Sequence, residues 1–202
     1  MDAADWDARY AGSPLVWSAG PNRWVRETFT DRTPGHALDL GAGEGRHALW
    51  LAGRGWDVTA VDFSAEAIRK ARSLQAENAP GTLGRIAWVR ADVLTYRHPP
   101  RTCAAVLALY LHLPAAERRT VLRAAAEALA PGGTLLVVGH DRTNPAEGVG
   151  GPSDLAVLFT AEDVVADLGA LPGLEVRRAE RARRPVGDGV ALDALVEVVR
   201  TA

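Results

Sequence analysis

The chain has 202 residues, 48% of them hydrophobic and 24% charged, which is typical of one globular domain with a sizeable core. Its formal net charge of −2 at pH 7 excludes a general binder of nucleic acid or of anionic membranes, because such a protein needs a basic field. The single cysteine, Cys103, excludes an internal disulfide and a cysteine-based zinc site, and the lack of an apolar leader or a membrane-length apolar run predicts a cytoplasmic location.

Short apolar runs alternate with longer helical patterns along the chain, which is typical of a parallel sheet covered by helices on both faces. The predicted strands, in chain order, cover residues 36–40, 57–61, 85–90, 104–109, 134–139, 174–181 and 192–199. The predicted helices cover residues 46–54, 64–78, 114–129 and 161–168. Five β/α units and a terminal hairpin result, so we predict a doubly wound α/β fold in one domain over residues 1–202.

Local signals set several of these boundaries. Ser64 is a suitable N-cap for the second helix. The third helix begins with Pro114 at its first position and stops before Pro131-Gly132-Gly133. The Gly- and Pro-rich stretch 141–152 predicts a long loop, which we interpret as a lid over a ligand site. Gly187-Asp188-Gly189 predicts the turn of the terminal hairpin.

A glycine-rich turn, Gly41-Ala42-Gly43-Glu44-Gly45, joins the first predicted strand to the first helix. Glycine is needed where a ligand approaches the backbone, and in open α/β sheets ligands bind at the carboxyl ends of strands. A dinucleotide-binding turn has the pattern G-x-G-x-x-G, whereas the last position here is Arg46. The neighbouring acids Asp39 and Glu44 would repel a pyrophosphate and suit a cofactor with an ammonium and a sulfonium. The turn therefore indicates a cofactor site, with a plain tight turn as the alternative.

Two further acidic residues end predicted strands. Asp62 ends the second strand, 21 residues after Gly41, the spacing at which a carboxylate accepts hydrogen bonds from an adenosine ribose. Asp92 ends the third strand, where it would accept from an exocyclic amine while the backbone N–H of Val93 meets a ring nitrogen. A solvated cap is the alternative for each Asp alone. Together with the glycine turn, the two acids form a series of three strand ends that indicates one binding crevice.

These residues resemble the class I S-adenosylmethionine-dependent methyltransferases, and the similarity runs through nearly the whole chain. Residues 39–45 resemble the family's first motif, Asp62 its ribose-binding acid and Asp92-Val93 its adenine-contacting pair. Leu129-Ala130-Pro131-Gly132-Gly133-Thr134-Leu135 resembles the turn before the family's fifth strand. The resemblance implies a Rossmann-like seven-stranded sheet, mostly parallel with an antiparallel last strand, in the order 3-2-1-4-5-7-6. The implied cofactor contacts are Trp6, Tyr10, Asp39, Gly41, Ala42, Gly43, Asp62, Phe63, Asp92, Val93 and Leu109.

The N-terminal segment is similar to that of the thiopurine and tellurite-resistance methyltransferases within this class. Those proteins open with an aromatic-containing helix, and here Trp6 and Tyr10 are four residues apart, on one helical face. The similarity implies that residues 1–33 form a helical cap, that Trp6 and Tyr10 cover the methionine end of the cofactor, and that Trp17 lies near the acceptor. In one departure from the family pattern, the fourth strand begins Cys103-Ala104-Ala105 where an Asp is usual, so contacts from that position stay open.

Candidate groups for a methyl acceptor follow the fourth and fifth strands. His112 and His140 are the candidate catalytic residues, because a hydroxyl acceptor needs a general base whereas a thiolate or tellurite needs none. Tyr110 and Asp141 are candidate acceptor contacts. The alternatives are a structural hydrogen bond for each His, and packing without chemistry for Tyr110. The five histidines lack metal-ligand spacing, so we expect no metal.

The predicted function is in-line transfer of a methyl group from S-adenosylmethionine to a small-molecule acceptor, either a thiol, a chalcogen oxyanion or a hydroxyl. We expect neither a nucleic acid nor a membrane as partner, and the oligomeric state is open. A nucleotide-dependent oxidoreductase on a Rossmann sheet is one alternative, against which Arg46 and the terminal hairpin count. A protein that binds the cofactor without catalysis is another.

Overall fold

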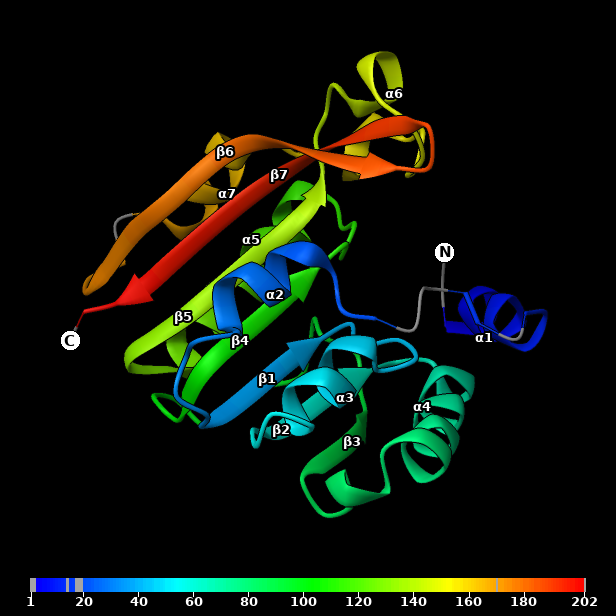
Figure 1. Ribbon diagram of the computed structural model, residues 1–202. Helices are drawn as coiled ribbons and strands as arrows, with labels where there is room; N and C mark the ends of the chain where they lie inside the picture. Colours follow the sequence, from blue (N-terminus) through cyan, green and yellow to red (C-terminus); the bar gives the residue numbers. More distant parts are fainter. Residues whose placement is uncertain (1–2, 14, 17–19, 170, 202) are drawn as a thin grey trace. The chain divides into compact units, whose positions relative to one another are not determined.

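Seven strands of the computed structural model, which describes residues 3–13, 15–16, 20–169 and 171–201, form one sheet (Figure 1). The strand order is β3-β2-β1-β4-β5-β7-β6, as the family resemblance implied. The chain divides into two compact units, residues 1–97 and 98–202. One domain over residues 1–202 stays a prediction. Among the described helices, none combines the length and the apolar character that crossing a bilayer requires.

The first unit contains the three strands at one end of this order. The strands are β1 (His36–Leu40), β2 (Asp57–Asp62) and β3 (Ile86–Arg90), and the helices are α1 (Ala3–Ala11), α2 (Arg23–Phe29), α3 (Arg46–Ala52) and α4 (Ala65–Asn78), with a 3-10 turn, η1 (Pro80–Thr82). β1 pairs with β2, and β2 with β3, in parallel. The strands and helices predicted in this part of the sequence are confirmed to within two residues. Most residues of β1 and β2 are buried, which is why both strands appear in the sequence as apolar runs.

Two helices lie in the N-terminal segment for which a helical cap was expected. The sequence did not predict the bounds of α2, because a helix of seven residues shows little periodicity in its hydrophobic residues. Its start is marked by Asn22, whose Oδ1 accepts a hydrogen bond from the Trp24 N–H at 2.8 Å. Trp24 and Phe29 are buried and hold the helix in place.

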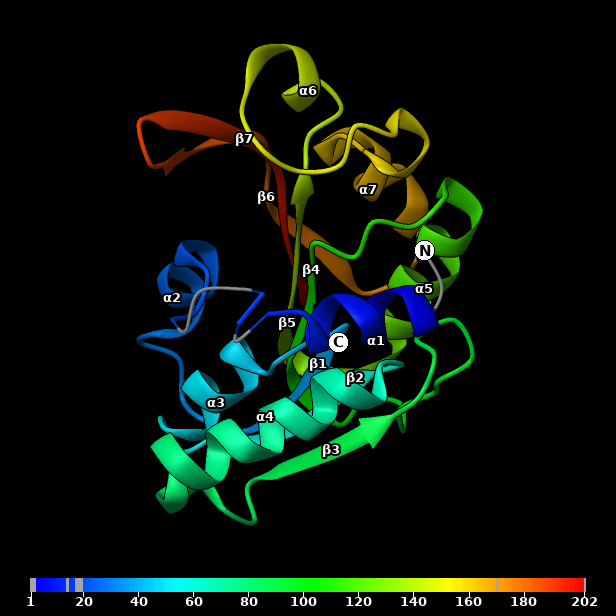
Figure 2. The ribbon, with the colours of Figure 1, turned by 90° about the vertical axis from the view of Figure 1, so that its right-hand side faces the viewer.

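Helix α1 lies along α4 in the first unit (Figure 2). Asp7 Oδ1 accepts from the Ser64 hydroxyl at 2.5 Å and from the Glu66 N–H at 3.1 Å. These bonds lower the pKa of Asp7, with the Ser64 hydroxyl as the main cause. Ser64 is also the N-cap of α4, as predicted. One serine therefore starts α4 and fixes α1 to it.

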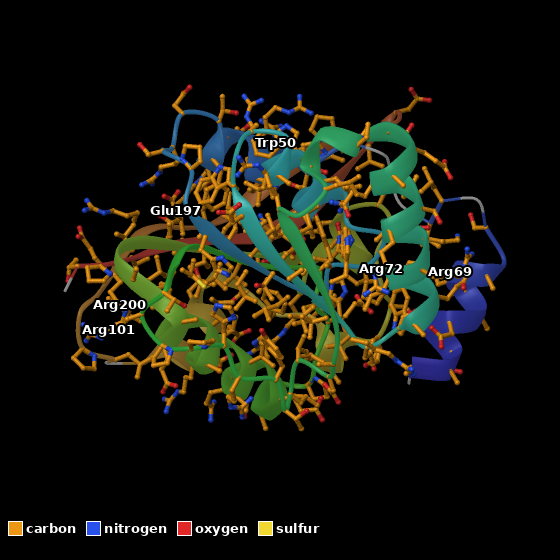
Figure 3. All side chains as sticks on the ribbon, turned by 90° about the horizontal axis from the view of Figure 1, so that it is seen from below. Trp50, Arg69, Arg72, Arg101, Glu197 and Arg200 are labelled. Atoms are coloured by element: carbon orange, nitrogen blue, oxygen red, sulfur yellow. The ribbon has the colours of Figure 1, made fainter. Side chains whose placement is uncertain are left out.

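The second unit contains a four-stranded portion with a long antiparallel hairpin. Its elements are β4 (Cys103–Leu109), α5 (Ala115–Ala128), β5 (Leu129–His140), α6 (Asn144–Glu147), η2 (Leu155–Val157), α7 (Ala161–Leu168), β6 (Leu174–Val186) and β7 (Gly189–Arg200). β4 pairs with β5 in parallel, and β7 pairs antiparallel with both β5 and β6. The hairpin strands are longer than predicted because pairing continues to a two-residue turn at Gly187-Asp188. Arg200, close to the end of β7, donates to the Ala126 carbonyl of α5 at 2.9 Å, and Arg101 lies at the same end of the unit (Figure 3).

Two predicted boundaries in this unit are corrected. Pro114 is the N-cap of α5 and not its first residue. β5 begins at Leu129 and includes Pro131-Gly132-Gly133, because these residues form a bulge where the register with β4 shifts next to Cys103. Gly133 is required in the bulge, since an added Cβ would lie 2.5 Å from the Cys103 carbonyl oxygen.

The predicted loop over residues 141–152 contains the short helix α6 and is anchored to β7 (Figure 1). Asn144, at the start of α6, is fully buried. Its Oδ1 accepts from the Leu192 N–H at 2.7 Å, and its Nδ2 donates to the Gly150 carbonyl at 2.8 Å. The part of the loop between Asn144 and Gly150 is therefore held in place, and a lid role stays a prediction.

Candidate functional site

The glycine turn between β1 and α3 is built on left-handed glycines. Gly41, Gly43 and Gly45 have φ angles of 71°, 55° and 80°, in the region that only glycine adopts readily. The N–H groups of Gly41 and Ala42 donate to the Val61 carbonyl of β2 at 2.9 and 3.0 Å. The turn is therefore fixed at the carboxyl end of β2, where the sequence placed a binding crevice.

Gly45 is also fixed by packing, and this leads to a testable prediction. An added Cβ would lie 2.3 Å from Trp88 Cη2 of β3. Gly45→Ala should lower the free energy of unfolding by about 2–4 kcal/mol, because overpacking adds to the cost of a left-handed alanine. Gly84→Ala is the control in a urea denaturation series, since Gly84 has a φ of 88° with nothing within 4 Å of the added Cβ. Equal losses in the two variants would show that the Trp88 contact is not the cause.

Asp62, the last residue of β2, is held against the glycine turn by two backbone groups. Its Oδ2 accepts from the Gly43 N–H at 2.8 Å, and its Oδ1 accepts from the Ser64 N–H at 2.9 Å. Burial raises the pKa of Asp62 above its usual value, against the lowering effect of these N–H groups. Each carboxylate oxygen can accept a second hydrogen bond. The predicted ribose-binding acid is thus beside the turn with acceptor capacity left over.

Asp39 of β1 is fully buried next to the same turn. Its Oδ2 has no hydrogen-bond partner among the described residues, and its Oδ1 lies 4.0 Å from His47 Nδ1 of α3. Burial is the main reason that the pKa of Asp39 rises to about 7; the Arg46 charge lowers it and the Asp62 charge raises it further. Burial also drives the pKa of His47 well below its usual value, so this imidazole is neutral. A buried carboxyl oxygen without a partner fits a cationic group of a ligand.

Glu44 is already paired within the protein. Its carboxylate accepts from the Val16 N–H at 2.9 Å and forms an ion pair with Lys70 Nζ at 3.3 Å. Both side chains are largely buried, so the two charges offset each other locally. Asp39 and Asp62, rather than Glu44, therefore carry the negative bias that the sequence predicted for the turn.

Asp92, after β3, has the capping arrangement that the sequence left as its alternative. The side chain is exposed, and its Oδ1 accepts from the Leu94 N–H at 2.9 Å. Val93 and Phe63 are half-buried. The cap uses one oxygen of the Asp92 carboxylate, so a contact of Asp92 or Val93 with adenine stays a prediction, as does a contact of Phe63.

The aromatic pair of α1 is formed as the sequence predicted. The rings of Trp6 and Tyr10 have centroids 5.5 Å apart, and Tyr10 is buried. The Arg9 guanidinium lies 5.0 Å from the centroid of the Trp6 ring. A role for Trp6 and Tyr10 over a cofactor stays a prediction, and Trp17, predicted to lie near the acceptor, is outside the described residues.

The second unit brings three of the predicted residues together at the carboxyl ends of β4 and β5. The rings of His112 and His140 are nearly parallel with centroids 5.5 Å apart, and the Tyr110 ring lies 5.2 Å from that of His140. Burial lowers the pKa of His112 to about 4 and also lowers the pKa of His140. Tyr110 has a φ of 54°, a backbone conformation that is rare outside glycine and recurs at functional sites.

Two charged residues that the sequence did not assign to this cluster, Asp193 and Arg184, also belong to it. Arg184 donates from Nε to Asp193 Oδ2 at 2.7 Å and from Nη2 to Oδ1 at 3.1 Å, and the Tyr110 hydroxyl donates to Oδ2 at 3.1 Å. Asp193 is fully buried and lies opposite His140 in the pairing of β7 with β5. The available signal was a lone acid in the apolar run 190–196, which predicts a buried and partnered carboxylate.

The two remaining candidates of this unit are buried. Leu109, at the end of β4, belongs to the core, and its predicted cofactor contact stays a prediction. Asp141 Oδ1 accepts from the N–H and the hydroxyl of Thr143, at 2.9 and 2.8 Å. The Asp141 side chain therefore caps a turn of its own loop, and an acceptor contact for it also stays a prediction.

Part of the sequence matches a known family and known proteins. Residues 37–133 match the family described as "Methyltransferase domain". An uncharacterized methyltransferase of Mycobacterium tuberculosis is 39% identical over 101 residues, which cover 50% of this chain and 48% of that protein. Ribosomal RNA small subunit methyltransferase C of Alcanivorax borkumensis is 43% identical over 53 residues, covering 26% of this chain and 16% of that protein. The chain thus spans about half, or less, of the length of these curated relatives.

Solved structures share the fold over most of the chain. TehB from Haemophilus influenzae superposes with a TM-score of 0.71 at 16% identity, covering 89% of this chain and 62% of that one. The glycopeptide N-methyltransferase MtfA, solved as a complex with S-adenosylmethionine, gives a TM-score of 0.64 at 24% identity, covering 87% and 92%. At these identities the likeness concerns the fold alone. Residues 37–133, which include the glycine turn, thus resemble a methyltransferase domain, and the 3-2-1-4-5-7-6 sheet agrees with the fold of these neighbours.

Proposed function

We propose that the chain is an S-adenosylmethionine-dependent methyltransferase that acts on a small molecule. One observation carries the proposal: two buried carboxyls flank the left-handed glycine turn, and Asp39 keeps an oxygen to which no described residue is hydrogen-bonded. The cofactor offers a cation and a pair of vicinal hydroxyls, which are the groups that Asp39 and Asp62 can bind. MtfA, which shares the fold, was solved with this cofactor.

The residues of the first unit fit the cofactor by their chemistry. Asp62 would accept hydrogen bonds from the ribose, Asp39 would pair with the ammonium, and the glycine turn would admit the amino-acid part close to the backbone. When bound, the cofactor supplies a methyl group on a positively charged sulfur. The contribution of the chain is to bind, to orient and to exclude water, and orientation alone lowers a barrier by about 7–11 kcal/mol.

The acceptor side is proposed for the second unit. Tyr110 and His112 follow β4, and His140 is the last residue of β5; the carboxyl ends of such strands carry ligands in this class of sheet. A small acceptor agrees with the net charge of −2, which disfavours a polyanion. A cytoplasmic location and the absence of nucleic-acid or membrane partners stay predictions from composition.

Calorimetry on the purified protein tests the proposed function. S-adenosylmethionine and S-adenosylhomocysteine should bind, whereas NAD should not, because the acids at the turn repel a pyrophosphate. Single-turnover transfer of a labelled methyl group to any acceptor would then separate an enzyme from a protein that only binds the cofactor. Binding of NAD in place of the two sulfur compounds would favour an oxidoreductase.

Cofactor binding should release protons near neutral pH. Asp39 has a pKa of about 7 in the ligand-free protein, and a nearby ammonium would stabilise its ionised form. At about pH 6.5, titrations in two buffers of different ionisation enthalpy should therefore show release of a large fraction of one proton.

The matched variant Asp39→Asn should bind without this release. Because the pKa of Asp39 in the folded protein, about 7, lies above the ordinary value for an aspartic acid, its ionisation lowers stability as the pH rises from about 4 to about 7. Asp39→Asn should therefore be more stable than the wild type above pH 7, and the difference should shrink in acid. Equal proton release in both proteins would exclude Asp39 as the titrating group.

A further inference from the structure

We propose that His140 is the catalytic base of the proposed methyl transfer, that Asp193 is its positioning residue, and that the acceptor is a hydroxyl compound. The inference rests on the proposed function and deepens it. It selects one of two neighbouring histidines and assigns a role to a carboxylate in the middle of an apolar strand.

The hydrogen bonding of the two histidines separates their roles. His112 Nε2 accepts the backbone N–H of His140 at 3.4 Å, so its proton is on Nδ1 and its lone pair is engaged. With a pKa of about 4, lowered mainly by burial, His112 is also a weak base. His112 therefore supports the backbone at His140 and leaves the chemistry to that residue.

The His140 ring lies near a carboxylate that accepts three hydrogen bonds from two residues. His140 Nδ1 is buried, has no hydrogen-bond partner in the described part of the chain, and lies 3.9 Å from Asp193 Oδ1. Asp193 is fully buried and receives two donors from Arg184 and one from Tyr110. A proton on Nδ1 faces this carboxylate and leaves the lone pair on Nε2. The separation exceeds a hydrogen bond, as such contacts often do before a ligand binds and tightens them.

The charges around His140 favour a neutral imidazole that can accept a proton. Among the described residues, Asp193 of β7 and Arg184 of β6 are the charged groups that act on it, and the neutral rings of His112 and Tyr110 pack beside it. Burial lowers the pKa of His140 most, Asp193 raises it and Arg184 lowers it. At pH 7 the ring is neutral, and Asp193 stabilises the imidazolium that forms on proton uptake.

Gly151 of the loop 141–152 lies against the Cδ2–Nε2 edge of the His140 ring, where a residue with a Cβ does not fit. An added Cβ at Gly151 would lie 2.6 Å from Cδ2 and 2.9 Å from Nε2 of the ring. Gly150 is the matched neighbour, since it has a similar φ, 72° against 80°, and no atom of a described residue lies within 4 Å of its added Cβ. A methyl group at position 151 therefore blocks the atom that the proposal assigns as base, and one at position 150 does not.

The step balances with the two substrates alone. The acceptor oxygen forms a bond to the methyl carbon while the carbon–sulfur bond breaks, and the sulfur keeps the electron pair. The O–H bond of the acceptor breaks, and its proton moves to His140 Nε2. The products are the methyl ether, S-adenosylhomocysteine and an imidazolium that later returns the proton to solvent. A soft anion such as a thiolate needs no such base, which gives a matched comparison of acceptors.

The first test measures the tautomer of the His140 imidazole directly and needs no methyl acceptor. Nitrogen-15 NMR of the full chain, with His140→Gln to assign the signal, should show His140 as the Nδ1–H tautomer with Nε2 unprotonated. In Asp193→Asn the pKa of His140 should fall and the tautomer preference should weaken, whereas Asp188→Asn in the exposed hairpin turn should change neither. An Nε2–H tautomer in the wild type would overturn the proposal.

The second test compares phenol with thiophenol, using labelled S-adenosylmethionine at about pH 8. His140→Gln should slow transfer to phenol by roughly 10²–10⁴-fold and transfer to thiophenol, which is already ionised, by less than about fivefold. Gly151→Ala should slow the phenol reaction at least about tenfold, and Gly150→Ala less than about twofold. Equal losses on the two acceptors, or methylation of thiophenol alone by the wild type, would overturn the proposal.

The two tests also separate this inference from the proposed function. Failure of S-adenosylmethionine to bind in calorimetry would reject the proposed function itself. Retained binding with the wrong tautomer, or with an unchanged phenol rate in His140→Gln, would reject only the role of His140. If Asp193→Asn fails to fold, the tautomer of the wild type and the Gly151→Ala and Gly150→Ala pair still decide.

Discussion

Asp167→Asn should lower the free energy of unfolding by about 3–5 kcal/mol, because it leaves a buried guanidinium without its charge partner. Asp167 of α7 is 3% exposed, and Arg118 of α5, 6% exposed, donates to its Oδ2 from Nε at 2.6 Å. The pair joins the two helices of the second unit, so its loss affects their packing as well as the charge. Urea denaturation of the variant and the wild type measures the change.

Arg119 provides the matched control for this prediction. It is adjacent to Arg118 on α5 and contacts the same carboxylate, with Nε 3.1 Å from Oδ1, but its side chain is 54% exposed. Arg119→Gln should therefore cost no more than about 1 kcal/mol. Replacing Arg118 by Met and Asp167 by Leu together should recover most of the loss, since no buried charge then remains unpaired. A small effect of Asp167→Asn, or a large one of Arg119→Gln, would show that the buried pair of Arg118 and Asp167 is not the main source of the loss in stability.

Much of the fold was predictable because burial on both faces leaves a strong pattern in the sequence. β1, β2 and β4 read as apolar runs between turn residues, and Ser64 marked a helix start. Pro131-Gly132-Gly133 marked the end of a helix, whereas the bulge that these residues form in β5 was not predicted. The short helix α6 could not be predicted, because four residues are too few to show a helical pattern. It is stabilised by the hydrogen bonds that Asn144 forms with distant residues.

The candidate site was predictable where a local motif carries it, and not where distant strands build it. Asp39, the glycine turn and Asp62 were found because each is a strand end with a recognisable spacing. The partnership of Asp193 with Arg184 depends on the antiparallel register of β6 and β7, which no local signal specifies. The same applies to His47, whose significance comes from its 4.0 Å approach to Asp39.

Asp62→Asn should weaken binding of S-adenosylmethionine by roughly ten- to a hundredfold, which corresponds to the 1.5–3 kcal/mol of hydrogen bonds to a charged group. The carboxylate accepts from Gly43 and Ser64 through different oxygens, and it would accept from the ribose with the remaining lone pairs. An amide has only one acceptor oxygen, so the variant must give up either the ribose or one of the backbone bonds. Calorimetry with the cofactor and with S-adenosylhomocysteine measures the loss.

Stability distinguishes a binding role of Asp62 from a structural one. Burial raises the pKa of Asp62, so its charged form lowers the stability of the protein without cofactor. This destabilisation is present above the pKa of Asp62 in the folded protein and absent in acid. Asp62→Asn removes that cost, and the relief offsets the lost backbone bond to within about 1 kcal/mol. Asp57→Asn, at the exposed start of the same strand, is the control and should change neither affinity nor stability. Unchanged affinity for the cofactor in Asp62→Asn would exclude the proposed contact between Asp62 and the ribose. The strongest reason to assign this cofactor to the glycine turn would then be lost.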